Sequence, residues 1–264
     1  MLTRIIYGLV LLPLVVIIVN FGGLPLRISL FFLSVISLYE LYKSIFPKRS
    51  LLDYFGYIFI FFYYFFINTV VYYFFVFTLV WIIINLIYMV LNFNKINLEK
   101  CICYIVLPIY TAVFLSTIYL VREISAYLVW FIFLSSWGSD TFCYFVGKFF
   151  GTRKLAKNLS PNKTIEGSIG GIVGACLVGV FYAIFFPNNY YYLLSINLII
   201  MYAIIFSVLA LFSQIGDLVA SAIKRQNDVK DFGDLIPGHG GVMDRFDSIL
   251  LTAPVFYIFI TFTL

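Results

Sequence analysis

The residues best suited to chemistry fall in one stretch near the end of the chain, between Asp217 and Asp247. Six of the twelve acidic residues lie in it, and basic residues stand between them. The surrounding sequence is mostly Phe, Tyr, Ile, Leu and Val. Charge buried beside such segments is costly unless it is paired or binds a metal. The stretch therefore predicts a metal-assisted site for phosphate chemistry at one face of a membrane.

Polar residues recur every four positions where the preceding apolar segment ends, as Ser213, Asp217, Ser221 and Arg225, and Lys224 flanks them. On a helix this spacing gives one face a carboxylate, hydroxyl groups and two cations. Lysine and arginine are suited to phosphate oxygens. We therefore expect Lys224 and Arg225 to act on a substrate phosphate and Ser221 to contact the substrate.

Two further carboxylates, Asp244 and Asp247, follow a glycine-rich turn. Their spacing of three places them on adjacent turns at the start of the last helix. Carboxylate oxygens are the hard ligands that Mg²⁺ prefers, usually shared with substrate phosphates. We expect Asp217, Asp244 and Asp247 to be catalytic metal ligands for one or two cations, and Arg245 to support a substrate phosphate. A salt-bridged loop at the membrane surface is the alternative.

The only histidine of the chain, His239, lies among three glycines. Its imidazole could hydrogen-bond a backbone carbonyl and fix the turn, or it could contact a phosphate or relay a proton. Zinc is not indicated, because a zinc site would need cysteine or further histidine ligands nearby. His239 is thus a candidate substrate-binding residue with both roles open.

A single carboxylate, Asp140, lies inside an apolar segment eight residues before Lys148. On a helix this places it about 12 Å from the end of the segment. An acidic residue within a membrane span is a candidate for function by default. The alternative is a structural hydrogen bond between helices or an ion pair with a nearby lysine. We include Asp140 among the candidate substrate-binding residues.

A basic loop covers residues 148–167 and ends in Ser-Pro-Asn-Lys-Thr-Ile-Glu-Gly. Ser160 or Thr164 could cap the helix that follows, and Glu166 could complete a capping box. A helix N-terminus beside Lys163 suits an anionic phosphate. We expect these four residues to bind substrate, with simple capping as the alternative. The glycines that follow would let another helix pack closely; they are Gly167, Gly170, Gly171 and Gly174.

The composition indicates a polytopic membrane protein. The chain is 63% hydrophobic and 11% charged, with a mean hydropathy of +1.05, whereas a soluble domain is typically about 25% charged. The expected fold class is an all-α transmembrane bundle of about nine spanning helices, with eight as the alternative. Asn68-Thr69 is the only polar place to turn within 51–91. The expected spans lie near 5–20, 24–46, 51–67, 70–91, 101–121, 126–147, 168–187, 193–221 and 248–264.

The basic residues suggest an orientation. If the N-terminus lies in the cytoplasm and the spans alternate, 15 of the 17 lysines and arginines fall in inner loops and only Arg27 and Arg122 fall outside. This is the asymmetry of the positive-inside rule. It accounts for the net charge of +5 without a nucleic-acid partner. Both 148–167 and 222–247 would then face the cytoplasm.

Polar residues within the spans accumulate from Ser135 onward. We therefore expect residues 1–125 to form a scaffold of transmembrane helices and residues 126–264 to form the catalytic region. Glu40 is an exception in the first half. It lies one turn from Lys43, and we expect a local ion pair between them.

At these motifs the chain resembles the phosphatidate cytidylyltransferases, also called CDP-diacylglycerol synthases. The signature of that family is a Ser, Lys-Arg, Lys-Asp, a Pro-x-His-Gly-Gly turn and Asp-Arg-x-Asp. It is present as Ser221, Lys224-Arg225, Lys230-Asp231, Pro237–Gly241 and Asp244–Asp247. Gly216-Asp217-Leu218, Ser160–Gly167 and Asp140 are also similar, so the resemblance extends from about residue 135 to the end. One departure is Asn162, where many members carry a second lysine.

The resemblance implies an enzyme that converts CTP and phosphatidate to CDP-diacylglycerol and pyrophosphate in phospholipid biosynthesis. It also implies dependence on Mg²⁺, with a second cation left open, a homodimer, and an active site on the cytoplasmic side of a bacterial-type inner membrane. The alternatives are transfer to another lipid phosphate and a cation-coupled transporter with Asp140 and Asp217 on its pathway. The absence of an internal sequence repeat stands against a transporter.

Overall fold

The computed structural model describes residues 2–46, 51–70, 72–94, 96–186, 198–235 and 240–263, without the side chains of 2–11 and 51. These residues are almost entirely helical, as predicted. The helices are α1 (Leu2–Phe21), α2 (Gly23–Ile45), α3 (Leu51–Phe65), α4 (Ile67–Val70), α5 (Phe74–Leu91), α6 (Leu98–Pro108), the π-helix η1 (Ile109–Val113), α7 (Phe114–Ile124), α8 (Val129–Phe150), α9 (Ile165–Phe185), α10 (Leu198–Gln226) and α11 (Met243–Thr263). The β structure of the described chain is one antiparallel hairpin, β1 (Lys154–Ala156) and β2 (Ser160–Thr164).

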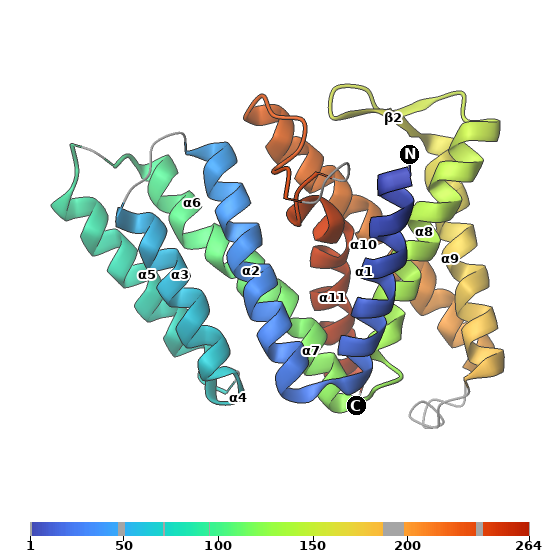
Figure 1. Cartoon of the computed structure of the whole chain (residues 1–264), viewed down its shortest axis with the longest axis horizontal. Coiled ribbons are helices and arrows are strands. Elements are labelled where there is room, and N and C mark those ends of the chain that lie inside the picture. The colour runs from blue at the N-terminus through green and yellow to red at the C-terminus, as the bar shows by residue number, and fades with distance from the viewer. Residues whose placement is uncertain are drawn as a thin grey trace.

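Six described helical segments are long and apolar enough to cross a membrane. They are α2, α5, the continuous rod Leu98–Ile124, α9, α10 and α11. Shorter apolar helices cover Leu12–Phe21 and Leu52–Phe65, and α8 has 22 residues without being among the six. The all-α membrane bundle is confirmed, and nine spans remain a prediction. The predicted reversal at Asn68-Thr69 lies in α4, which joins α3 to α5 (Figure 1).

The rod formed by α6, η1 and α7 is irregular where Pro108 ends its first part. Proline has no N–H to donate, and a single π-helical turn follows directly. Neighbouring helices satisfy carbonyls of that turn: Ser34 donates to the Thr111 carbonyl at 3.2 Å, and Tyr64 donates to the Ala112 carbonyl at 3.3 Å. Hydrogen bonds from α2 and α3 therefore hold this segment of the scaffold.

The loops that carry most of the predicted site residues gather at one end of the bundle. Figure 1 shows the hairpin and the start of α11 at that end, and α4 and the C-terminus at the opposite end. The two connections are shorter than the predicted loops 148–167 and 222–247, because α8 continues to Phe150, α10 continues to Gln226, and α11 begins at Met243.

The two arginines predicted on the outer side have structural partners. Arg27, near the start of α2, donates through Nε to the Tyr64 carbonyl at 2.6 Å, and Arg122, near the end of α7, donates through Nε to the Val19 carbonyl at 2.8 Å. Both acceptors lie at the C-terminal ends of helices, where carbonyls lack partners within the helix. Capping of helix ends explains why two arginines occur on the predicted outer side, where the positive-inside rule predicts few basic residues.

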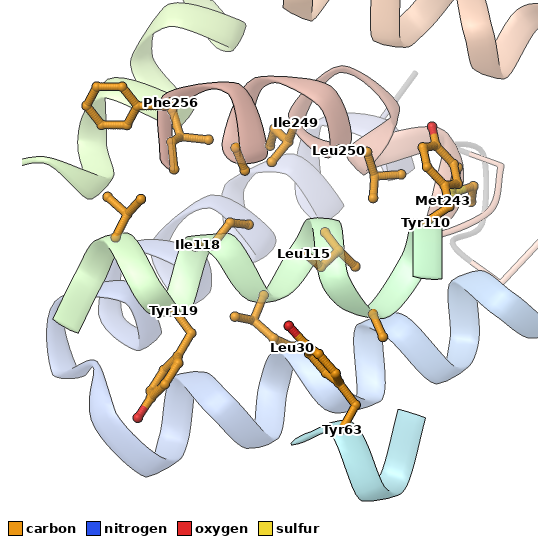
Figure 2. Close-up of a cluster of buried hydrophobic side chains, with 14 of the residues drawn as sticks. Leu30, Tyr63, Tyr110, Leu115, Ile118, Tyr119, Met243, Ile249, Leu250 and Phe256 are labelled. Atoms are coloured by element: carbon orange, nitrogen blue, oxygen red, sulfur yellow. The ribbon is translucent and has the colours of Figure 1, made fainter. Parts of the chain in front are cut away.

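The core of the bundle is centred on α7. Figure 2 shows α7 between α11 and α2, with Leu115 and Ile118 among the buried side chains and Leu250 facing them from α11. Helix α11 packs against α7 and α2 as well as against α8 and α10. The predicted scaffold and catalytic regions therefore share a buried interface, and α11 packs against helices of both regions.

Helices α8 and α9 approach each other at glycines, as the sequence predicted. A Cβ atom at Gly170 would lie 2.5 Å from Cβ of Val146, and one at Gly167 would lie 2.9 Å from the Cys143 carbonyl oxygen. Small residues let helix backbones come close in a membrane, where van der Waals packing drives association. This contact brings the hairpin and the start of α9 against α8.

Candidate active site

A cavity of about 490 Å³ opens between the hairpin and helices α8, α9 and α10. Five residues that the sequence singled out line it, although they come from separate stretches. They are Asp140, Ser160, Lys163, Thr164 and Asp217. The volume lies in the range of small-molecule sites, about 300–1,000 Å³. The predicted residues of the hairpin thus share one concave surface with Asp140 of α8 and Asp217 of α10.

The charges in the cavity are close together. Lys163, from β2, forms an ion pair with Asp217, from α10, and the two side chains are 27% and 31% exposed. Asp140 is exposed on the α8 wall, with Lys163 and Asp217 as electrostatic neighbours. Because both partners of the ion pair still reach solvent, a charged ligand in the cavity could displace either one.

Gln214 was not predicted as a site residue, yet it connects three helices at the wall of the cavity. Its Nε2 donates to Ser139 Oγ at 3.2 Å and to the Ser168 carbonyl at 3.0 Å, and its Oε1 accepts from the Ser168 hydroxyl. It lies one turn before Asp217 on α10. Its position inside an apolar helix was the only sequence signal, and its partners could not be deduced from it.

Thr164 caps α9, since its Oγ1 accepts a hydrogen bond from the Gly167 N–H at 3.1 Å. The predicted capping box is wrong, because the third position of the helix is Gly167 rather than Glu166. The Glu166 carboxylate instead accepts from the N–H and hydroxyl of Thr152, at 3.1 and 2.8 Å, and from the Arg153 N–H. It therefore ties the chain that leaves α8 to the start of α9.

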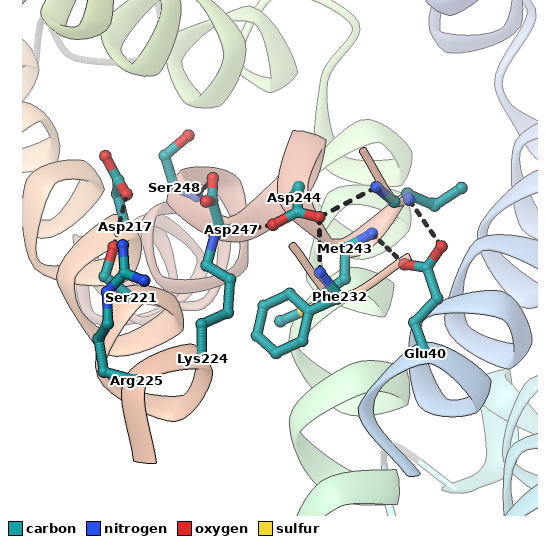
Figure 3. Close-up of polar contacts among 12 residues, drawn as sticks. Glu40, Asp217, Ser221, Lys224, Arg225, Phe232, Met243, Asp244, Asp247 and Ser248 are labelled. Carbon is teal, nitrogen blue, oxygen red and sulfur yellow. Dashed lines mark hydrogen bonds and ion pairs between the residues drawn. The ribbon is translucent and has the colours of Figure 1, made fainter. Parts of the chain in front are cut away.

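Asp244 is the most completely bonded of the three predicted metal ligands. Its Oδ1 accepts from Lys224 Nζ at 2.7 Å, and its Oδ2 accepts from the backbone N–H groups of Phe232 and Gly241 at 2.9 and 3.0 Å (Figure 3). The Asp244 side chain is 3% exposed. Asp244 therefore joins α10 and the loop before α11 to the first turn of α11. Its full set of partners offsets the cost of burying a charge.

Asp247 lies where the backbones of α10 and α11 are in close contact. A Cβ atom at Gly216 would be 2.6 Å from the Asp247 carbonyl oxygen, so only glycine fits between the two backbones. Asp217, the next residue on α10, and Lys224 are electrostatic neighbours of the Asp247 carboxylate. One Asp247 oxygen accepts from the Ser248 N–H at 2.8 Å. The helix crossing therefore brings Asp217 and Asp247, thirty residues apart, to the same site.

The other predicted residues surround this crossing. Ser221 Oγ lies 3.5 Å from Asp217 Oδ1, and Arg225 donates through Nε to the Leu159 carbonyl at 3.3 Å, which links α10 to the hairpin. Arg245 is exposed in the first turn of α11. His239 lies outside the described residues.

Glu40 is the second residue that the sequence did not connect to the site. The expected local pair with Lys43 does not account for its position. Its carboxylate accepts from the backbone N–H groups of Val242 and Met243 at 3.0 and 2.8 Å (Figure 3). The partners are about 200 positions away in the chain, which is why the sequence could not reveal them.

The carboxylates fit a divalent cation in part. No group of three or more His, Cys, Asp or Glu side chains among the described residues is arranged to hold a metal ion. Mg²⁺, however, is usually bound by one or two carboxylates together with substrate phosphates and water. Asp217 and Asp247 are close enough to interact, and both residues are partly exposed, whereas Asp244 is buried and both of its oxygens accept hydrogen bonds.

Comparison with known proteins identifies the relatives of this chain. The Cytidylyltransferase family matches residues 2–263. A protein of Bacillus subtilis (strain 168) named phosphatidate cytidylyltransferase is 33% identical over 267 residues, which cover 97% of this chain and 94% of the relative. Proteins with the same name from Rickettsia felis and Staphylococcus aureus (strain COL) are 43% and 37% identical over 57% and 64% of this chain, and over 64% and 62% of their own lengths.

These matches confirm the resemblance seen in the sequence motifs. The family match covers nearly the whole chain, and the relative from Bacillus subtilis is aligned over almost all of both proteins. The chain therefore belongs to the cytidylyltransferase family and is a membrane-embedded nucleotidyltransferase.

Proposed function

We propose that this protein transfers the cytidylyl group of CTP to phosphatidate, giving CDP-diacylglycerol and pyrophosphate. The name that the relatives share supports this choice of substrates. The observation that carries the proposal is the cavity at the loop end of the bundle, with Lys163 and Asp217 on its wall. One substrate is a soluble polyanion and the other is held in the bilayer, so the reaction needs a charged site at the membrane edge.

The triphosphate of CTP is proposed to enter the cavity beside the hairpin. Lys163 would exchange its partner Asp217 for phosphate oxygens, and Ser160 and Thr164 lie on the same wall. The N-terminus of α9 adds backbone N–H groups and a favourable dipole for an anion. Glu166 would act here through the Thr152 and Arg153 contacts that support the hairpin.

The transfer itself is proposed to be an in-line displacement. A phosphate oxygen of phosphatidate attacks the α-phosphorus of CTP, and the bond from that phosphorus to the bridging oxygen breaks as pyrophosphate leaves. Such a reaction depends mostly on positioning and charge neutralisation. Lys224, Arg225 and Arg245 would meet phosphate oxygens at the α10–α11 side, and Ser221 and His239 remain proposed substrate contacts.

Asp217, Asp244 and Asp247 remain the proposed Mg²⁺ ligands, with Asp217 and Asp247 first because the Asp244 carboxylate is buried and fully hydrogen-bonded. The ion would neutralise phosphate charge and help to align the two substrates. Asp140, which lines the cavity from α8, is proposed to contact substrate or to contribute to a second cation site.

The proposed setting is a bacterial-type inner membrane, with the hairpin end facing the cytoplasm, where CTP is available. The excess of lysine and arginine in the predicted inner loops supports this orientation. The homodimer that the sequence resemblance implies is part of the same proposal.

Turnover of labelled CTP by the purified protein in liposomes tests the function. We expect labelled CDP-lipid only when phosphatidate and Mg²⁺ are both present, and much less with other lipid phosphates. Preference for another lipid phosphate would mean that phosphatidate is not the acceptor, while cytidylyl transfer would remain the reaction. Ion-driven uptake into the liposomes without release of pyrophosphate would contradict the proposal and favour a transporter.

A further inference from the structure

We propose that Glu40 is a positioning residue for the transfer reaction. Its carboxylate reaches from α2 in the scaffold to the start of α11, and it thereby places Asp244 and Asp247. The activity part of this inference rests on the proposed function, whereas its structural part does not.

The contact is a helix cap supplied by a different helix. Oε1 of Glu40 accepts from the Val242 N–H at 3.0 Å, and Oε2 accepts from the Met243 N–H at 2.8 Å. The first N–H groups of a helix have no partner within it, and a carboxylate there is favoured by the helix dipole. Glu40 is 3% exposed, so water does not offer these N–H groups a substitute.

The backbone of the loop encloses the Glu40 carboxylate. A Cβ atom at Gly233 would lie 2.6 Å from Oε1, and one at Gly241 would lie 2.5 Å from Oε2. Both contacts are too close for a Cβ atom, so a side chain at either position would displace the carboxylate from its present place. The carboxylate therefore lies closely between two loop segments.

Glu40 and Asp244 share the amides of the loop. Asp244 accepts from Phe232 and Gly241, and Glu40 accepts from the next two residues, Val242 and Met243. Figure 3 shows the two carboxylates on either side of this backbone, with Lys224 completing the pair on the Asp244 side. A continuous set of charge-assisted hydrogen bonds thus runs from α2 through the start of α11 to α10.

This arrangement predicts an effect on turnover rather than on nucleotide binding. Glu40 is not among the residues that line the cavity, which is formed by the hairpin, α8, α9 and α10. Loss of its carboxylate would free the first turn of α11 and shift Asp247 relative to Asp217. A misplacement of about 1 Å can lower the rate about 10²-fold.

The test compares Glu40→Gln with Asp53→Asn. Glu40→Gln keeps the shape of the side chain but places an amide N–H against a backbone N–H. Asp53 is also a buried acid of the scaffold, 2% exposed, and its Oδ1 accepts from the Tyr104 hydroxyl at 2.9 Å, within the N-terminal helices. The readouts are kcat and KM for CTP, together with amide hydrogen exchange in residues 240–243.

For Glu40→Gln we expect kcat to fall about 10- to 100-fold, KM for CTP to stay within about threefold, and exchange in 240–243 to speed up. Asp53→Asn should leave kcat and this exchange close to those of the unsubstituted protein. If Glu40→Gln does not fold, Gly233→Ala, which pushes on the carboxylate and leaves Glu40 in place, should give the same change in kcat.

Unchanged kcat and unchanged exchange in Glu40→Gln or Gly233→Ala would overturn the inference. Equal losses in Glu40→Gln and Asp53→Asn, or a parallel rise in KM, would also overturn it, because they would reveal a general loss of structure. If the unsubstituted protein does not turn over CTP, the proposed function fails, and the exchange measurement still decides whether Glu40 fixes the start of α11.

Discussion

Two lysine–aspartate pairs involve residues two turns apart on α10, Asp217 and Lys224, and they differ in their surroundings. The side chains of Lys163 and Asp217 are 27% and 31% exposed and face the cavity, whereas those of Lys224 and Asp244 are 13% and 3% exposed. Asp244 also accepts from two backbone N–H groups. An exposed pair contributes little to stability and can exchange partners, whereas breaking a buried pair is costly.

The same two residue types therefore serve different purposes. On the cavity side, Lys163 and Asp217 carry charges that a substrate can reach. On the α11 side, Lys224 and Asp244 carry charges that hold a loop and a helix in place. Gly216, where α10 and α11 nearly touch, connects the two sides. Substitutions should separate them, since the cavity side should affect activity alone and the α11 side should affect stability as well.

The largest effect on activity is expected from Asp217→Asn. It would remove a proposed Mg²⁺ ligand, and loss of one stabilising group at a reacting centre lowers kcat about 10²- to 10³-fold. The melting temperature should barely change, because the side chain is partly exposed. Steady-state kinetics and a thermal unfolding curve measure both. Activity close to normal would contradict the role of Asp217.

Asp244→Asn should instead destabilise the protein. Removing one partner of a buried, hydrogen-bonded ion pair costs about 3–5 kcal/mol, because the Lys224 ammonium loses its opposite charge and an NH2 donor replaces one of the two acceptor oxygens. Unfolding in denaturant or by heat measures this loss. If Asp244→Asn unfolds like the parent protein and loses only Mg²⁺ dependence, Asp244 is a metal ligand first and a structural residue second.

Gly216→Ala tests the connection between the two sides. The added methyl group would lie 2.6 Å from the Asp247 carbonyl oxygen, a backbone atom that cannot rotate away. The helices must separate, and we expect kcat to fall about 10²-fold. Gly138→Ala is a milder control, since its nearest neighbour would be a Val178 methyl at 3.2 Å. An equal fall in kcat for the two substitutions would contradict the proposal that Gly216 matters because α10 and α11 are in contact there.

Lys163→Ala should have the smallest effect of the four and should act on binding. A hydrogen bond to a charged group contributes about 1.5–3 kcal/mol, so KM for CTP should rise about tenfold or more. Lys148→Ala, at another position on the cavity wall, provides a comparison. A fall in kcat with unchanged KM would assign Lys163 to the reacting centre instead.

The membrane bundle and the helix faces could be predicted because their signals are local. The four-residue spacing on α10, the glycines of α9 and the polar turn at Asn68-Thr69 each depend on neighbours within a few turns. The site was predicted for the same reason, since most of its residues fall in two short segments. The structure then added which of them face the cavity together.

The contacts that cross the molecule could not be predicted. Glu40 finds its partners on α11, and Gln214 on α10 binds Ser139 and Ser168 from two other helices. Neither pairing leaves a pattern in the sequence, because each depends on how the helices pack. The hairpin was missed for a different reason: its strands have three and five residues, too few for a clear alternation.

Photo-crosslinking with a light-activated CTP analogue shows where the nucleotide binds. We expect adducts on residues 143–168, on the hairpin and the adjoining ends of α8 and α9, and unlabelled CTP should compete with the analogue. Adducts at the opposite end of the bundle, or labelling that CTP does not reduce, would contradict the assignment of the cavity to the nucleotide.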